Sequence, residues 1–329
     1  MTPLNVHLLY DYAPNVLDYL RTLLEPGIHI TSGESVIPEK NLHILVAGRP
    51  DRALLTAHPE LTALIVPWVG IPPQTRELLA GFPQIALYNL HHNAEPVAEM
   101  ALALLLAAAK AVIPLDQALR RGDWSPRYND PPSSLLLSGK TALILGMGAI
   151  GQLVARACQA LNMTVLAIKR TVTPAAILPF VDGVFSSFDL HDLLPRADAL
   201  IVTLPLTPET EGLLGADELR LLPQHCVLVN IGRGSVIDEE ALYMALKEHS
   251  IGAAGLDVWY NYPASDKERA GTLPAALPFW ELENVVLSPH RAGLTEGIDL
   301  LRMRHLARLL NAAARNERIP NHVDLAAGY

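Results

Sequence analysis

Three glycines near the middle of the chain have the spacing of a dinucleotide-binding turn. A run of β-forming residues leads into Gly146, Gly148 and Gly151, which match the pattern G-x-G-x-x-G, and a helical segment follows. The first glycine allows a sharp turn, the second leaves room for a pyrophosphate, and the third lets helix and strand pack closely. The helix N-terminus, with Ala149 and Ile150 at its start, then offers N–H groups to the phosphates. Considered alone, this hexapeptide also fits a glycine-rich turn without a ligand.

Two basic residues end the second strand expected after this turn. Lys169 and Arg170 stand where a dinucleotide-binding domain usually has an acidic residue that binds the ribose hydroxyls of NAD. A carboxylate would repel a 2′-phosphate, whereas a guanidinium can bind one through paired, charge-assisted hydrogen bonds. We therefore expect NADP(H) to be preferred over NAD(H), with a solvated basic turn as the alternative.

An arginine and a histidine lie far apart in the sequence, but each follows a predicted strand. Arg233 stands between two glycines after one strand, and His290 follows another in the sequence Ser-Pro-His. Ligands of doubly wound sheets bind at the carboxyl ends of the strands, so we expect both side chains at one edge, with Asp257 at the end of a neighbouring strand. A guanidinium and an imidazole can stabilise the charge that hydride transfer creates on a carbonyl oxygen. Taken singly, a solvated arginine and a structural histidine are the alternatives.

The composition limits the class of protein. The chain has 329 residues, half of them hydrophobic and 18% charged, which is enough for about two domains with large cores. A net charge of −9 argues against nucleic acid or an anionic membrane as the main partner. Cys158 and Cys226 are too few for a disulfide framework, which favours a reducing cytosol. We expect no signal peptide and no metal site, and the longest apolar run, 100–109, is too short to span a membrane.

The candidate residues require a framework of alternating strands and helices. Such alternation extends along the chain and predicts parallel sheets with crossover helices. In the first part, strands are expected at 6–10, 29–31, 44–47, 63–66 and 85–87, and helices at 12–24 and 95–112. From residue 140 on, strands are expected at 141–145, 164–168, 183–185, 199–204, 226–230, 252–257 and 285–288, and helices at 152–161, 189–194, 216–221, 239–248 and 296–316. Residues 120–135 are expected to form a loop and 319–329 an irregular tail.

Several motifs occur in an order that is typical of one family. They are the glycine turn at 146–151, LPLTPET at 204–210, NIGRG at 230–234, DE at 238–239, GLDVW at 255–259 and SPH at 288–290. As a set they resemble the D-isomer-specific 2-hydroxyacid dehydrogenase family, strongly over about 93–293 and more weakly at both ends. The resemblance implies two doubly wound, parallel-sheet α/β domains. A flavodoxin-like substrate (catalytic) domain would comprise 1–92 and 294–329, and an NAD(P)-binding Rossmann domain, 93–293, would be inserted in it. A homodimer is also implied, with the loop around Trp124 as a candidate arm.

The resemblance also implies roles for individual residues. Arg233 would orient the substrate and polarise its carbonyl, and His290 would be the general acid for reduction and the base for oxidation. Substrate-binding positions carried over from the family are Trp68, Val69, Gly70 and Asn93. Cofactor-binding positions are Gly146, Gly148, Ala149, Ile150, Gly151, Lys169, Arg170, Leu204, Pro205, Thr210, Ile231, Gly232 and Asp257.

One position departs from the family pattern. Tyr262 stands where the family usually has a Glu that pairs with the catalytic histidine. A carboxylate would raise the pKa of the histidine, whereas a phenol is neutral at neutral pH. We therefore predict a lower pKa for His290 than the usual pair would give. The formate dehydrogenases of the same superfamily have a neutral Gln at this position, so hydride transfer remains compatible with the change.

The function expected from the sequence is NAD(P)-dependent hydride transfer to or from a small 2-oxo or 2-hydroxy acid, with NADP(H) as the preferred cofactor. A glyoxylate- or hydroxypyruvate-like acid is the specific substrate expected. Oxidation of another small anion, such as formate, is one alternative. A non-catalytic protein that senses NADP(H) or binds a partner is the other, and Tyr262 favours it while Arg233 and His290 count against it.

Overall fold

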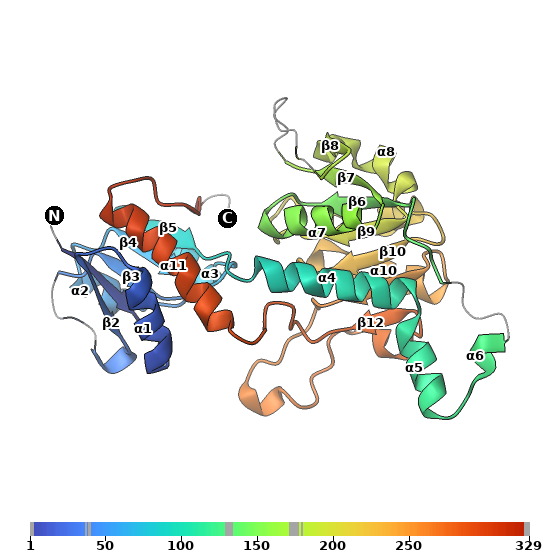
Figure 1. The fold of residues 1–329 in the computed structure, drawn as a ribbon, viewed down its shortest axis with the longest axis horizontal. Helices are drawn as coiled ribbons and strands as arrows, with labels where there is room; N and C mark the ends of the chain where they lie inside the picture. Colours follow the sequence, from blue (N-terminus) through green and yellow to red (C-terminus); the bar gives the residue numbers. More distant parts are fainter. Residues whose placement is uncertain are drawn as a thin grey trace. The chain divides into compact units, whose positions relative to one another are not determined.

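The chain divides into two units. The computed structural model describes residues 3–36, 38, 41–128, 134–170, 178 and 180–325. Unit 1 combines Met1–Asn93 with Leu294–Tyr329, and unit 2 is Ala94–Gly293 (Figure 1). Unit 2 is therefore one continuous segment inserted into the sequence of unit 1.

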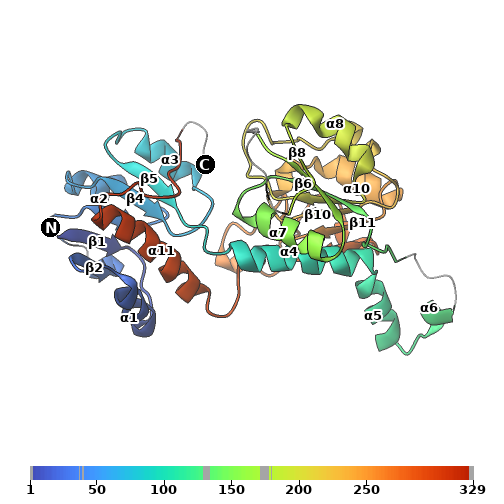
Figure 2. The same cartoon turned by 45° about the horizontal axis from the view of Figure 1, so that its top comes forward.

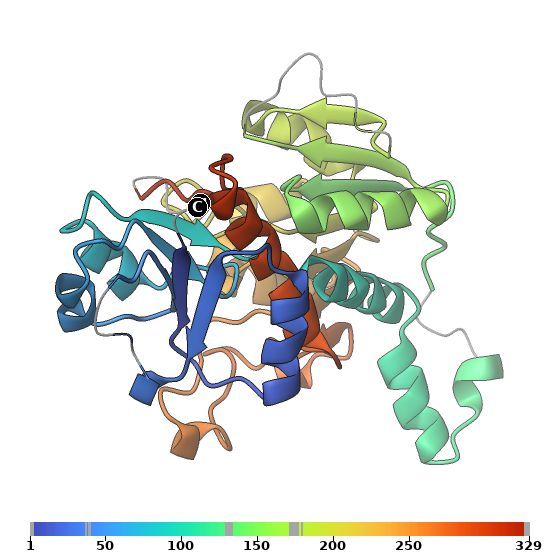
Figure 3. The same cartoon turned by 60° about the vertical axis from the view of Figure 1, so that its left-hand side comes forward.

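Unit 1 contains a parallel sheet with the strand order β2-β1-β3-β4-β5. Its strands are β1 (Leu4–Leu8), β2 (Ile28–Ser32), β3 (Ile44–Val46), β4 (Ala63–Val66) and β5 (Ala86–Asn89). Its helices are α1 (Pro14–Leu23), α2 (Arg52–Ala57), α3 (Pro73–Leu79) and α11 (Ile298–Ala314). Helices α1 and α11 lie side by side on one face of the sheet, and α2 and α3 cover the other (Figure 3). This order is that of a flavodoxin-like domain, in which ligands bind where strand order reverses.

Unit 2 contains a longer parallel sheet with the order β12-β11-β10-β9-β6-β7-β8. Its strands are β6 (Thr141–Leu145), β7 (Thr164–Ile168), β8 (Gly183–Phe185), β9 (Ala199–Val202), β10 (Val227–Asn230), β11 (Ala253–Leu256) and β12 (Val285–Leu287). The strand order reverses between β6 and β9, because β7 and β8 extend to one side and β9 to β12 to the other. This reversal is the switch point at which a dinucleotide binds in a Rossmann domain.

Helices cover both faces of the unit 2 sheet. One core lies against α4 (Ala94–Ala109) and α7 (Ala149–Ala160), and the other lies against α8 (Leu190–Leu193), α9 (Ala216–Arg220) and α10 (Glu239–Lys247) (Figure 2). The central strands β6, β9 and β10 are buried on both faces, which explains their continuous apolar sequences. The fold class predicted from the sequence is thus confirmed.

Several predicted boundaries were wrong by a few residues, such as the first strand, which was expected at 6–10 and is β1 at Leu4–Leu8. The largest error concerns a helix. The sequence predicts one helix at 95–112 followed by a loop at 120–135, but α4 ends at Ala109 and a second helix, α5 (Val112–Arg120), follows. Ala111 adopts a left-handed φ of +49°, which turns the chain, and an Asp116–Arg120 pair supports the new helix. A short helix, α6 (Ser125–Tyr128), lies in the predicted loop. Positions 129–133 of that loop and 326–329 of the predicted tail lie outside the described residues.

Across the described residues, no single helix has the length and apolar composition needed to cross a membrane. Helices α4 and α5 meet these criteria only as a pair, and they are bent by 65° at their junction.

Candidate active site

The glycine turn of unit 2 forms an open cradle at the switch point. Gly146 adopts a φ of +101°, and the Thr203 hydroxyl donates to its carbonyl oxygen at 2.9 Å. A Cβ on Gly151 would collide with that same oxygen, so only glycine lets α7 approach β6 this closely. Gly148 is the N-cap of α7, and a Cβ there would meet no atom within 4 Å. Close packing at Gly151 therefore holds α7 against β6, while the open space at Gly148 leaves room that fits a pyrophosphate.

Ala149 and Ile150 form the start of α7, as the motif predicts, so their N–H groups lie at the positive end of the helix dipole. No acidic residue stands at the end of β7. Lys169 and Arg170 are both exposed there, and the Lys169 N–H donates to the Phe185 carbonyl oxygen at 2.9 Å. Thr171, the next residue of this basic turn, lies outside the described residues.

Arg170 also interacts with a neighbouring loop. Hydrogen bonding by Thr207 is the larger cause that lowers the pKa of Glu209, and the charge of Arg170 adds to it. Thr210 fixes this loop, because its hydroxyl donates to the Pro205 carbonyl oxygen at 2.6 Å. Arg170 thus lies at the same edge as the loop that follows β9.

The loops after β9 and β10 pack against each other. A Cβ on Gly232 would lie 2.5 Å from the Leu204 carbonyl oxygen, so glycine is required for this contact. Ile231, which precedes Gly232, is buried. These residues belong to the predicted cofactor-binding set and, with Leu204 and Pro205, form the carboxyl edge beside the cradle.

Arg233 is positioned by a buried asparagine that the sequence analysis did not single out. The Asn230 amide donates to the Arg233 carbonyl oxygen at 3.0 Å, while its oxygen accepts from the Gly232 N–H at 3.1 Å. The guanidinium itself donates to the Gly232 carbonyl oxygen at 2.6 Å. Because Asn230 is only 1% exposed, these bonds are shielded from water and fix the turn that carries Arg233. The sequence did hold a signal for this role, namely an asparagine at the end of an apolar strand.

A buried carboxylate positions the turn that carries His290. Asp257 is 1% exposed and accepts from the Ser288 hydroxyl at 2.5 Å and from the N–H groups of Arg291 and Ala292 at 2.8 and 3.0 Å. His290, between these donors, adopts a left-handed φ of +52°. Both carboxylate oxygens of Asp257 are thus engaged in holding the loop after β12.

Tyr262 lies beside His290. Their ring centroids are 5.5 Å apart, with the planes tilted by 58°. The Tyr262 hydroxyl accepts from the Trp259 N–H at 3.1 Å, and the Trp259 indole donates to the Ser288 carbonyl oxygen at 2.8 Å. One set of contacts therefore connects the loop after β11 with the loop after β12.

Charges within this cluster shift its pKa values. Desolvation is the larger cause that lowers the pKa of His290 below 6.5, the charge of Arg233 lowers it further, and Asp257 opposes the shift. Burial lowers the pKa of Arg233, and burial likewise raises that of the Tyr262 phenol. Within the described part of the chain, no carboxylate accepts a hydrogen bond from the His290 ring. The causes of this shift are burial and Arg233, so the lower pKa expected from Tyr262 in place of a glutamate stays a prediction.

The substrate-binding positions expected from the family lie in unit 1. Trp68, Val69 and Gly70 follow β4, and the Trp68 ring lies 6.0 Å from that of Tyr10. Asn93 ends unit 1, and its side-chain oxygen is buried without a hydrogen-bond partner among the residues that the structure describes. The loop 68–70 and Asn93 therefore lie near the carboxyl ends of two neighbouring strands, β4 and β5.

Two histidines precede Asn93. His92 is 3% exposed, and burial together with Arg302, His305 and His91 lowers its pKa to about 3. It is therefore a neutral side chain near neutral pH. Over the described ranges, no three His, Cys, Asp or Glu side chains gather in a group that could hold a metal ion.

Comparison with known proteins identifies the family. The model of the NAD-binding domain of D-isomer specific 2-hydroxyacid dehydrogenases matches residues 102–292, which is more than half of the chain. The glyoxylate reductase of Aeropyrum pernix is 34% identical over 287 residues, which cover 86% of this chain and 82% of that protein. The chain belongs to the D-isomer specific 2-hydroxyacid dehydrogenase family. The family predicted from the sequence motifs is thereby confirmed, and it is a family of NAD(P)-dependent oxidoreductases.

Two further members of the family bear on the comparison. The D-3-phosphoglycerate dehydrogenase of Methanocaldococcus jannaschii is 32% identical over 233 residues, which are 70% of this chain but 41% of that longer protein. The chain thus spans less than half of that relative. A solved structure of the NADPH-dependent glyoxylate/hydroxypyruvate reductase of Sinorhizobium meliloti, in complex with NADP and malonate, has a TM-score of 0.70 and 26% identity, covering 99% of this chain and 98% of that one.

Proposed function

We propose that the protein is an NADPH-dependent reductase of small 2-oxo acids such as glyoxylate or hydroxypyruvate. One observation carries the proposal: the titratable side chains Arg233, Tyr262 and His290 form one cluster at the sheet edge that also holds the open glycine cradle. Glyoxylate reductase activity in a relative of similar length supports the substrate class.

The cofactor part of the proposal rests on the cradle and on the end of β7. The space in front of Gly148 would take the pyrophosphate, and the α7 N-terminus would stabilise its charge. Lys169 and Arg170 would bind a 2′-phosphate, which favours NADP(H) over NAD(H). The relative from Sinorhizobium meliloti was determined with NADP, in agreement with this preference.

The loops beside the cradle complete the proposed cofactor site. Leu204, Pro205 and Thr210 follow β9, and Ile231 and Gly232 follow β10. Their backbones pack tightly at the carboxyl edge, so they would flank the nucleotide between its phosphates and its nicotinamide end. Asp257 would act indirectly, by holding the turn that carries His290.

The catalytic part assigns one task to each charged side chain. A bound nicotinamide nucleotide supplies the hydride. Arg233 would hold the substrate carboxylate and polarise its carbonyl, because its backbone is fixed and its guanidinium is largely shielded from water. His290 would donate a proton to the carbonyl oxygen during reduction and accept one during oxidation. Because burial and Arg233 lower its pKa below 6.5, the protonated form that reduction needs becomes more abundant as the pH falls.

Unit 1 would serve as the substrate domain. Trp68, Val69, Gly70 and Asn93 lie at the carboxyl ends of its neighbouring strands β4 and β5. Backbone N–H groups of this loop would bind the substrate carboxylate. Unit 2, in this proposal, is the NAD(P)-binding domain with boundaries close to residues 93 and 293.

The proposal includes a homodimer. Large apolar side chains on α5 and in the turn between α5 and α6 are exposed, among them Leu119 at 52% and Trp124 at 59%. A second copy of the chain could cover them. A cytosolic site of action is also part of the proposal, because both cysteines are buried thiols rather than partners in a disulfide.

Tyr262 favours one second candidate function. Its phenol is neutral and accepts a hydrogen bond from Trp259, so the site has no carboxylate at the position that usually raises the pKa of the histidine. Oxidation of an anion such as formate, in which no hydroxyl must lose a proton, would suit such a site.

A panel of substrates tests the proposal. Purified protein should oxidise NADPH in the presence of glyoxylate or hydroxypyruvate, and NADPH should be preferred over NADH. Reduction of NADP by formate would instead support the second candidate. If the protein quenches NADPH fluorescence but turns over none of these acids, the protein binds the nucleotide without catalysis and the proposal is wrong.

A further inference from the structure

Three consecutive carbonyl oxygens in the loop that follows β4 accept hydrogen bonds from donors in one part of unit 1. The Arg302 Nε donates to the Pro67 oxygen at 3.2 Å, and the Leu90 N–H donates to the Trp68 oxygen at 3.4 Å. The Asn89 amide donates to the Val69 oxygen at 2.7 Å. All three donors belong to β5, to the residue directly after it, or to α11.

These bonds determine where the neighbouring N–H groups point. In a trans peptide, the C=O of one residue and the N–H of the next point in opposite directions. No described peptide bond in the chain is cis. The N–H groups of Trp68, Val69 and Gly70 therefore point away from β5 and α11. None of the three donates to another residue within the described part of the chain.

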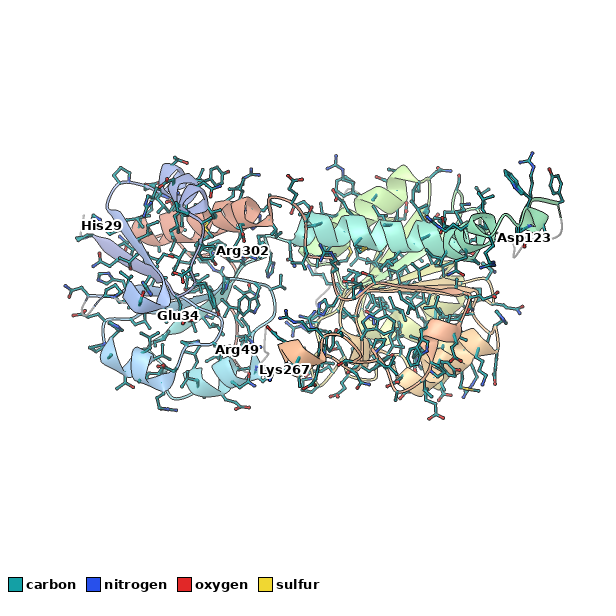
Figure 4. The ribbon with its side chains drawn as sticks, turned by 90° about the horizontal axis from the view of Figure 1, so that it is seen from below. His29, Glu34, Arg49, Asp123, Lys267 and Arg302 are labelled. Carbon is teal, nitrogen blue, oxygen red and sulfur yellow. The ribbon has the colours of Figure 1, made fainter. Side chains whose placement is uncertain are left out.

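The two side chains that hold this loop are themselves fixed. Asn89 is 4% exposed, and its backbone exchanges hydrogen bonds with Asn321, with its N–H donating at 3.3 Å and its oxygen accepting from the Asn321 amide at 3.1 Å. Arg302 is 21% exposed, pairs with Asp299 one turn earlier on α11, and hydrogen-bonds the Tyr12 hydroxyl (Figure 4 labels Arg302). Residues from the C-terminal segment thus stabilise a loop more than 200 positions earlier in the sequence.

We propose that Asn89 and Arg302 are positioning residues that turn the N–H groups of Trp68, Val69 and Gly70 towards the carboxylate of the substrate. This inference rests on the proposed function, which assigns substrate binding to that loop. N–H groups held in place before the substrate arrives bind a carboxylate without the cost of ordering the loop. When one anchor is lost, the attached peptide can rotate, and one charge-assisted hydrogen bond to the substrate is lost with it.

The test compares Arg302→Met with Arg302→Lys and Asn89→Ser. Arg302→Met keeps the apolar stem but removes the donors, so the KM for glyoxylate should rise roughly ten-fold while kcat changes less than about two-fold. Arg302→Lys restores a charged donor near the Pro67 oxygen and should recover part of the loss. In Asn89→Ser the serine side chain is too short to reach the Val69 oxygen, so this variant should raise the KM for glyoxylate without any change at Arg302. The inhibition constant of oxalate should rise in parallel, and the Kd for NADPH should not change.

Arg304→Met is the matched control, because Arg304 is exposed on the same helix. It should leave both constants at the wild-type value. If Arg302→Met and Asn89→Ser bind oxalate as tightly as the wild type, or if the control variant weakens binding equally, the positioning role is wrong. If the wild type itself neither reduces a 2-oxo acid nor binds oxalate, both the proposed function and this inference are overturned. Should Arg302→Met fail to fold, Arg302→Lys and Asn89→Ser decide the outcome.

Discussion

Replacing Tyr262 by glutamate should raise the pKa of His290 and extend reduction to higher pH. In the wild type, desolvation and the charge of Arg233 lower the His290 pKa below 6.5. Reduction needs the protonated imidazole, so its rate should fall as the pH rises through that lowered value. Oxidation needs the neutral ring and should show the opposite dependence.

The size of the shift follows from the distance between the two side chains. The ring centroids of Tyr262 and His290 are 5.5 Å apart, and Tyr262 is 48% exposed. A unit negative charge at about this distance from an imidazolium contributes about 0.8 kcal/mol in water and about 3 kcal/mol at an effective dielectric constant of about 20. These energies correspond to a rise of about 0.5 to 2 pKa units. Since the position is half exposed, we expect a rise of about one unit.

The pH dependence of kcat/KM for glyoxylate reduction measures this shift. Tyr262→Glu should move the midpoint of the alkaline limb upward by about one unit, so that the rate above the midpoint rises up to roughly ten-fold. Tyr262→Phe replaces one neutral ring with another and serves as the control, because it should leave the midpoint in place. If the glutamate variant has an unchanged midpoint, or if the phenylalanine variant shifts it as far, the electrostatic account of this site is refuted.

Three further predictions concern the cofactor site and stability. Gly148→Ala places a methyl group in open space, so it should leave Tm within about 2 °C of wild type yet weaken NADPH binding at least about ten-fold, as measured by fluorescence titration and thermal unfolding; unchanged NADPH affinity would mean that the pyrophosphate lies elsewhere. Arg170→Ala should raise the KM for NADPH roughly ten-fold or more and leave that for NADH unchanged, whereas an equal effect on both would contradict a 2′-phosphate contact. His92 has a pKa of about 3 in the fold, so the unfolded chain binds more protons between about pH 3 and 6.5 and stability must fall as the pH falls through this window. Between about pH 6.5 and 5, urea unfolding should show the wild type losing about 2 kcal/mol more than His92→Gln, and parallel losses would refute this assignment.

The sequence was sufficient to predict the framework because the framework depends on local patterns. Buried strands such as β6 and β7 were predicted with their observed bounds, since continuous apolar runs bounded by polar turns are typical of two-sided burial. The glycine turn was equally predictable, because each of its glycines meets a steric demand that other residues do not. Helix α5 was missed because a single left-handed residue, Ala111, redirects the chain, and Pro114, which marks the first turn of the new helix, was not taken as a helix start.

The side chains that support the site were harder to predict. Arg233 and His290 carry charge and follow strands, so they stand out in the sequence. Asn230 and Arg302 act through hydrogen bonds to backbone carbonyl and N–H groups, and these partners exist only once the chain has folded. A residue whose partner lies 235 positions away has no local signal.

The most direct test of the account measures turnover and cofactor binding together in Arg233→Gln and His290→Gln. The account predicts that each variant loses at least about 100-fold in kcat/KM for glyoxylate and that the double variant loses little more, because the two side chains act on one carbonyl. The affinity for NADPH should stay at the wild-type value in all three. Turnover that persists in either single variant, or a loss of activity explained by lost NADPH binding, would contradict the claim that these two residues form the catalytic pair.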